Sequence, residues 1–168
     1  MSERRIKREL EKIKKDPSPD WSAGPIKDSD LYKWKGKIIG PRNTPYEWGV
    51  FYLNICFPTN YPFEPFTINF TTKIYHPHVH SSGQIHCCDY PYLFSSKNIP
   101  GYWNPVNPNC TIRGAFDSLI ENLKDIKINC DSVNPEIVDM FLKNREEFSK
   151  TAKMWTKKYA RKFFFLIK

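Results

Sequence analysis

The sequence predicts an α+β fold, in which an N-terminal helix precedes a four-stranded antiparallel meander, an irregular segment and C-terminal helices. Apolar residues recur at helical spacing near both ends of the chain, whereas short runs that alternate between apolar and polar residues lie between them. Because those runs follow one another closely, they favour antiparallel neighbours. The chain has 168 residues, and we expect all of it, 1–168, to form one domain.

Ser2 is expected to cap the first helix, which should end before the Asp-Pro pair at 16–17. Serine is a common N-cap residue, and Ile6, Leu10 and Ile13 repeat at helical spacing among charged residues. Proline disfavours the helical conformation in the residue before it, so the helix should stop there.

The meander is expected to contain about four strands, and the sequence delimits three of them. The runs 31–39, 50–57 and 67–72 are rich in β-branched and aromatic residues. Turns rich in proline and glycine or aromatic residues separate them at 40–46 and 58–65.

Regular structure fades between residues 75 and 109, and helices follow. Residues 112–123 carry an apolar stripe at helical spacing. Asn134-Pro135-Glu136 is typical of a helix start, with proline near the first turn. A last helix is expected over 148–166, and its apolar end, 163–167, should be buried or form an exposed docking patch.

The formal net charge of +8 suggests an anionic partner, but its distribution argues against nucleic acid. Basic residues concentrate at 4–15 and 150–168, both with helical patterning. Each stretch is typical of a solvated helix face or of a docking face for an acidic protein. No zinc-finger, RNP or basic-zipper pattern accompanies them, so we expect no nucleic-acid binding.

The chain carries five cysteines, which we expect to be free thiols in the cytoplasm, the nucleus or both. An odd cysteine count favours a reducing compartment, and no apolar leader follows the first residues. No window approaches the length of a membrane span, so we expect none.

The fourteen residues from His76 to Asp89 contain all four histidines and two of the five cysteines. This cluster is compatible with a metal site, with a cysteine nucleophile and its helpers, or with a site that has lost its chemistry. The spacing matches no standard zinc module, and adjacent cysteines chelate one tetrahedral ion poorly. We therefore expect no metal. If the cluster did bind a metal ion, the candidate ligands would be His76, His78, His80, His86, Cys87, Cys88 and Cys110.

Motifs along nearly the whole chain resemble those of ubiquitin-conjugating enzymes (E2), and most closely the small class that is little more than the catalytic core. The motifs are Arg5-Ile6-x-x-Glu9-Leu10, Ser22-Ala23-Gly24-Pro25, Gly40-Pro41, Thr44-Pro45-Tyr46, Gly49-Val50-Phe51, Phe57-Pro58-Thr59-x-Tyr61-Pro62-Phe63, Phe70-Thr71-Thr72-Lys73-Ile74-Tyr75-His76-Pro77, Asn134-Pro135-Glu136-Ile137 and Trp155-Thr156-Lys157-Lys158-Tyr159-Ala160. The resemblance implies the family fold and ubiquitin transfer by thioester exchange. An E1 enzyme would pass the ubiquitin carbonyl to an E2 cysteine, and an E3 would then promote transfer to lysine. Thiolate suits this exchange because it is both a strong nucleophile and a good leaving group.

The active-site motif departs from the family pattern. The family has His-Pro-Asn followed by Gly-x-Ile-Cys-Leu-Asp, with the asparagine eight residues before the cysteine. Here His78 stands at the asparagine position, and the residue eight positions later is His86. Counted rigidly, the nucleophile has been replaced. One inserted residue restores the match, because Cys87-Cys88-Asp89 then aligns with Cys-Leu-Asp.

The resemblance therefore implies Cys87 as nucleophile, with Cys88 as the alternative. His78 would assist the oxyanion from a ring nitrogen, or would be a buried histidine bonded to backbone. Asp89 would support the site. Asp131 matches the acidic gate residue that orients the incoming lysine, or it caps the next helix. An insertion at about 90–102 could roof the cysteine or pack on itself.

The resemblance also implies which residues bind partner proteins. Ser22 matches the backside position that binds a second ubiquitin in some members. Helix 112–123 would hold the donor ubiquitin. No cofactor is expected, because the E1 uses the ATP, and the chain is expected to be a monomer that works with a RING or HECT E3. The positions that match E1-binding and E3-binding residues are Arg4, Arg5, Arg8, Pro62, Phe63, Asn104 and Pro105. A catalytically inactive variant that binds ubiquitin or an E3 is the alternative function, and a ubiquitin-like protein could replace ubiquitin.

Overall fold

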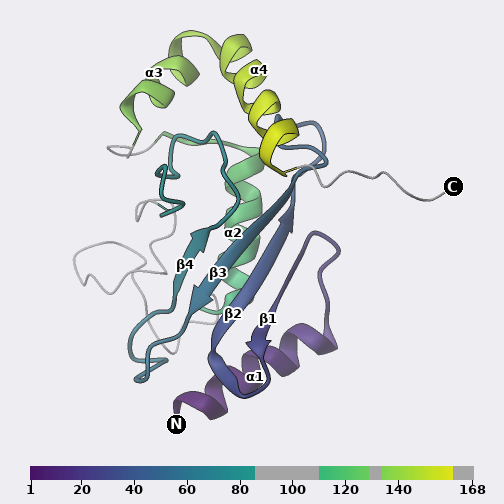
Figure 1. The fold of residues 1–168 in the computed structure, drawn as a ribbon, viewed down its shortest axis with the longest axis vertical. Helices are drawn as coiled ribbons and strands as arrows, with labels where there is room; N and C mark the ends of the chain where they lie inside the picture. The colour runs from purple at the N-terminus through teal and green to yellow at the C-terminus, as the bar shows by residue number, and fades with distance from the viewer. Residues whose placement is uncertain (86–109, 129–133, 161–168) are drawn as a thin grey trace, which may run out of the picture.

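The computed structural model describes residues 1–85, 110–128 and 134–160, and it has the predicted α+β architecture (Figure 1). One helix precedes a four-stranded sheet, and the later helices follow it. The expected order of elements is confirmed. The elements are α1 (Ser2–Lys15), β1 (Trp21–Lys27), β2 (Asp30–Ile39), β3 (Val50–Cys56), β4 (Thr67–Phe70), α2 (Ile112–Lys124), α3 (Pro135–Lys143), α4 (Arg145–Trp155) and a π-helical turn, η3 (Thr156–Ala160).

The sheet is an antiparallel meander in which each strand pairs with the next along the chain, in the order β1-β2-β3-β4. The two central strands match the predicted runs within one residue, because both alternate regularly between buried and exposed positions. β4 ends at Phe70, two residues before the predicted limit of 72. β1 was not delimited by the sequence pattern. It contains Gly24 and Pro25, and proline fits there because β1 is an edge strand.

The prediction that Ser2 caps the first helix is wrong. The N-cap position is Met1, and no side chain caps it. The Ser2 hydroxyl instead donates a hydrogen bond to the carbonyl oxygen of Thr59, in the turn after β3. Ser2 is buried there, so it ties the helix to that turn. The helix ends at Lys15, immediately before the Asp-Pro pair, as predicted.

The core lies between the sheet and α2, which crosses one face of the sheet (Figure 1). Trp21 of β1 stacks on Phe116 of α2, with ring centroids 4.6 Å apart. Gly36 of β2 lies beneath the same ring, where an added Cβ would come within 2.5 Å of Phe116. A side chain at position 36 would therefore push the helix from the sheet, and we infer that glycine sets the helix-to-sheet distance here.

The C-terminal helices lie at one end of the molecule (Figure 1). α3 begins after Asn134, as predicted. The predicted start of the last helix at 148 is wrong, because the Asn144 side chain accepts a hydrogen bond from the Glu147 backbone N–H at 3.1 Å and caps α4. The predicted extension to 166 and the apolar stretch 163–167 lie outside the described residues past 160. Within the described ranges, no helix has both the length and the apolar character of a membrane span.

Candidate active site

The structure describes the first part of the predicted active-site motif, residues 76–85. His78 and the segment that leads to the cysteines are described. The other predicted catalytic residues and two of the predicted E3-binding residues lie outside the described residues, so their roles stay predictions. These are Cys87, Cys88, Asp89, Asp131, Asn104 and Pro105, with the insertion at 90–102.

The chain before the cysteines is held by backbone pairing up to Ile85. Gln84 forms a β-bridge with Asn69, and Ile85 forms one with Val79. Gly83 has a φ of 88°, and a Cβ at that position would lie 1.9 Å from the carbonyl oxygen of Phe70. The Gly-Gln-Ile stretch is therefore held in one register. Any one-residue shift that brings Cys87 to the family's cysteine position has to follow Ile85, at His86.

His78 is fully buried, at 0% exposure. Its Nε2 lies 3.0 Å from the carbonyl oxygen of Lys127, in the segment that leads toward α3. A neutral imidazole has one N–H. If a neutral His78 donates it to this carbonyl, the ring has no second N–H to donate elsewhere. This geometry is that of a buried histidine bonded to backbone. Assistance to an oxyanion stays a prediction, and it requires a second N–H on this ring.

His76 is neutral in the folded protein at neutral pH. Burial, and next the neighbouring His78, lower the pKa of His76 to about 3, against a smaller opposing effect of Asn122. The Nδ1 atom of His76 accepts a hydrogen bond from the His78 backbone N–H at 3.1 Å. This contact places the His76 proton on Nε2. We infer that His76 shapes the turn that precedes the active site.

A third side chain, Asn134, holds this turn from the other direction. Its Nδ2 donates to the carbonyl oxygen of Val79 at 2.6 Å and to that of His76 at 3.4 Å. The sequence indicated Asn134 only as a helix start. A side chain just before a proline at N1 projects from the helix end, so the structure adds a second role that local patterning does not reveal.

No group of three or more histidines, cysteines or carboxylates suited to a metal ion occurs within residues 1–85, 110–128 and 134–160. Four of the seven candidate ligands, His76, His78, His80 and Cys110, are described. The other three lie outside, so the expectation of no metal stays a prediction.

Comparison with known families identifies the fold. The family model described as "Ubiquitin-conjugating enzyme" matches residues 5–156. The chain belongs to the ubiquitin-conjugating enzyme family. The match spans both sides of the cysteine segment and includes every element from α1 to α4. The family fold and the resemblance drawn from the motifs are therefore confirmed.

Glu9 connects several elements of this E2 fold, and this role was not predicted from the sequence. It is 3% exposed. Its Oε1 lies 3.0 Å from Arg5 Nε and accepts from the Tyr61 hydroxyl at 3.4 Å, while its Oε2 accepts from the Ile112 backbone N–H at 3.4 Å. One carboxylate thus joins α1, the turn after β3 and the start of α2. Its position three residues after Ile6 on the apolar stripe was a signal available in the sequence.

The electrostatics of Glu9 reflect its burial. Desolvation raises the pKa of Glu9, and the charge of Arg5 is the largest of the opposing effects. Because the folded-state pKa is raised, this group favours the fold at low pH, and its contribution is lost as pH rises through that pKa. Removing the carboxylate leaves the Tyr61 hydroxyl and the Ile112 N–H without this acceptor.

Replacing Glu9 with alanine is expected to lower the free energy of unfolding by about 2 kcal/mol, because the Tyr61 hydroxyl and the Ile112 N–H lose this buried acceptor. Urea unfolding of the wild type and E9A measures this difference. E11A is the matched control, because Glu11 is exposed on the same helix, and it should change stability by less than about 0.5 kcal/mol. Equal stability of E9A and E11A would contradict a structural role for the buried carboxylate.

The predicted E1-binding and E3-binding residues of the E2 fold differ in how accessible they are. Arg4 and Arg8 are exposed on α1, whereas Arg5 is partly buried in its ion pair with Glu9. Phe63 is 65% exposed in the turn after β3. Pro62 beside it is partly buried, and Ser22 is exposed on β1. Among these predicted docking residues, Arg4, Arg8 and Phe63 are therefore accessible, whereas Arg5 forms an ion pair within α1.

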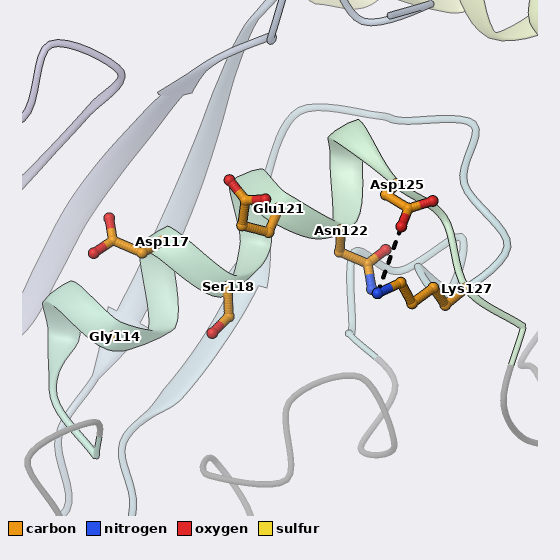
Figure 2. Close-up of a pocket in the computed structure, with 7 residues that line it drawn as sticks. All are labelled: Gly114, Asp117, Ser118, Glu121, Asn122, Asp125 and Lys127. Carbon is orange, nitrogen blue, oxygen red and sulfur yellow. Dashed lines mark ion pairs between the residues drawn. The ribbon is translucent and has the colours of Figure 1, made fainter.

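An open groove runs along α2 and carries three carboxylates (Figure 2). Asp125 pairs with Lys127 across 3.5 Å, and Glu121 pairs with Lys124 across 2.7 Å. Asp117 reaches across to the sheet, where its Oδ1 accepts from the Trp21 indole N–H at 2.9 Å. We call this feature the α2 groove. Its lining residues are Gly114, Asp117, Ser118, Glu121, Asn122, Asp125 and Lys127.

Proposed function

We propose that this chain is an E2 that accepts ubiquitin from an E1 as a thioester on Cys87 and passes it to a lysine with the help of an E3. The family match over residues 5–156 carries the proposal, because it extends to both sides of Cys87. A ubiquitin-like protein in place of ubiquitin would follow the same chemistry.

The proposed reaction consists of two acyl transfers. The Cys87 thiolate attacks the carbonyl of the E1 thioester, the E1 thiolate leaves, and a new thioester bond forms. A lysine amine then attacks this thioester, an amide bond forms, and Cys87 leaves as a thiolate. Asp131 would accept or orient the lysine proton, and Asp89 would support the site. His78 would stabilise the oxyanion, provided that its ring presents a second donor. No cofactor is needed, because the E1 uses the ATP.

The docking proposal assigns α1 to the E1, and α1 with the turn after β3 to a RING or HECT E3. Arg4 and Arg8 are exposed on α1, and Phe63 exposes an aromatic ring at the turn. The buried Glu9 carboxylate connects both elements, so it would fix their relative position. Asn104 and Pro105 would complete the E3 site. The chain would act as a monomer.

Replacing Phe63 with alanine is expected to weaken E3 binding by about tenfold or more, because an exposed aromatic anchor loses its contact area. Affinity for a RING domain, measured by titration calorimetry, checks this expectation. L142A is the matched control, since Leu142 is also a large exposed apolar residue, on α3. If F63A and L142A bind the RING domain equally well, Phe63 is not an anchor.

The α2 groove is the proposed seat of the donor ubiquitin. Glu121 and Asp125 are exposed and are paired with exposed lysines, so they can exchange these ion pairs for lysine or arginine of a partner. Asn122, which lines the groove, also lies beside His76 at the turn before the active site. A ubiquitin held in this groove would therefore lie near the segment that leads to Cys87.

A catalytically inactive E2 variant is the second candidate function, and a specific observation favours it. The bridges to Gln84 and Ile85 hold the register that precedes the cysteine position, and the next residue is His86. If the chain continues without a shift, a histidine takes the nucleophile's position. Such a protein would bind ubiquitin or an E3 as a scaffold or competitor.

A charging assay distinguishes the two candidates. The protein is mixed with E1, ATP and ubiquitin and run on a gel with and without reductant. A reductant-sensitive ubiquitin adduct supports the E2 proposal, and its absence beside a control E2 that charges supports the inactive variant. Cys56 is an exposed free thiol, which fits the proposed location in the cytoplasm, the nucleus or both.

A further inference from the structure

The sheet has a second face, on the side opposite α2. Side chains alternate along β2, so Trp34, Gly36 and Ile38 are buried while the lysines between them are exposed. We call Lys33, Lys35 and Lys37 the lysine row. The three side chains lie on one face at every second residue, which sets neighbouring lysines about 7 Å apart along the strand.

The neighbours of the lysine row are small or uncharged. On β1, Ser22 lies opposite Lys37 and Gly24 lies opposite Lys35. On β3, Tyr52 lies opposite Lys37 and Asn54 opposite Lys35. The β1 residues are too short to cover the ammonium groups.

The charge of the lysine row is largely uncompensated. Asp30 is the one acidic residue in the four strands, and its Oδ2 lies 3.9 Å from Lys33 Nζ at the end of the row. No carboxylate among the described residues is within ion-pair distance of Lys35 or Lys37. Three like charges on one strand raise the local positive potential, which attracts an anionic partner.

We infer that the lysine row is a docking site for an acidic segment of a partner protein that lies extended across the outer face of the sheet. An extended peptide repeats its side chains on one face every second residue, about 7 Å apart, which is the spacing of the lysines. A segment with Asp or Glu at alternate positions would pair one carboxylate with each ammonium group. This inference stands whether or not the chain transfers ubiquitin.

The composition of this face favours a protein carboxylate over nucleic acid. The four strands contain no arginine, the residue that recognises phosphate with a two-pronged geometry. Tyr52 is the one aromatic residue on this face beside the row, and it is partly buried. Single-stranded nucleic acid needs several exposed rings on which its bases stack.

The two sides of the sheet also differ in charge. The α2 groove carries Asp117, Glu121 and Asp125, whereas the opposite face carries the lysine row. The groove carboxylates Glu121 and Asp125 are paired with Lys124 and Lys127, whereas Lys35 and Lys37 have no ion-pair partner among the described residues. The uncompensated charge is therefore on the lysine row. Ser22 lies beside the row, so the prediction of a second ubiquitin at this position competes directly with the inference of an acidic partner.

The test uses a fluorescently labelled peptide of alternating Glu and Ser residues, titrated with the full chain and followed by anisotropy. The variant K33Q/K35Q/K37Q is expected to bind this peptide about tenfold more weakly, the combined effect of three exposed ion pairs. The control K143Q/K150Q/K153Q removes three positive charges from α3 and α4 and should bind within about twofold of the wild type. Thermal unfolding of both variants verifies that the exposed substitutions leave the fold intact.

Single-stranded DNA and ubiquitin serve as competing probes. Loss of peptide binding in the lysine-row variant alone, with amide NMR shifts centred on residues 33–37, supports the inference. Equal loss in both variants would show a non-specific charge effect and overturn it, as would an absence of peptide binding by the wild type. Binding of DNA or ubiquitin that is tighter than peptide binding and is lost with the row would also overturn it, in favour of that partner.

Discussion

Replacing Cys87 with alanine is expected to abolish the reductant-sensitive ubiquitin adduct completely, whereas replacing Cys88 should leave it. Alanine has no nucleophile, so no thioester can form at that position. The bridges at Gln84 and Ile85 hold the preceding register, so one extra residue, His86, separates Ile85 from Cys87. A single extra residue is accommodated readily in an irregular segment. Charging of the wild type, C87A and C88A on parallel gels measures the effect.

The other outcomes of this experiment are informative. Loss of the adduct only in C88A would move the nucleophile by one residue. Loss in both variants would mean that the pair acts together or that the substitutions disturb the site. Replacing the exposed Cys56 with alanine provides the control, because it removes a thiol of β3 that is not part of the motif. The C56A variant should form as much reductant-sensitive ubiquitin adduct as the wild type.

The sheet was predictable where side-chain alternation is regular. In β2 and β3, buried and exposed side chains alternate, and the observed ends of both strands lie within one residue of the predicted ends. β1 was not delimited, because Gly24 and Pro25 interrupt the apolar and β-branched signal, and pairing with β2 creates the strand. The Ser2 prediction failed because the hydroxyl found a tertiary partner in Thr59, which no local cap pattern includes.

The site was predictable as a set of positions but not as a set of contacts. The motif placed His78 next to the active site, yet its partner is the carbonyl of Lys127, forty-nine residues away. Backbone carbonyls leave no residue-type signal in a sequence. Glu9 was recognisable in principle, since a carboxylate on an apolar stripe must find partners once it is buried. Its partners Tyr61 and Ile112 lie on other elements, and only the fold identifies them.

The buried His76 gives the fold a measurable sensitivity to acid. His76 has a pKa of about 3 in the folded state because burial, and next His78, disfavour its charge. An unfolded chain titrates this group near its ordinary value of about 6.5. Between these values the unfolded state binds a proton that the folded state does not. The stability contribution of His76 is therefore fully present above pH 6.5 or so and is lost as pH falls toward 3.

Replacing His76 with glutamine is expected to remove this component of the pH dependence. Each pH unit below about 6.5 costs the wild type about 1.4 kcal/mol through this group, so the wild type should lose roughly 3 kcal/mol more than H76Q between about pH 7 and pH 4. H76Q itself should be less stable at neutral pH, because Nδ1 accepts the His78 N–H in the wild type. Urea unfolding of both proteins across this pH range measures the difference in their free energies of unfolding, which should narrow as the pH falls. H80Q is the control for the substitution itself, since it makes the same change at an exposed histidine. A constant difference between the wild type and H76Q at all pH values would show that His76 takes up its proton inside the fold, and the acid sensitivity would then belong to other groups.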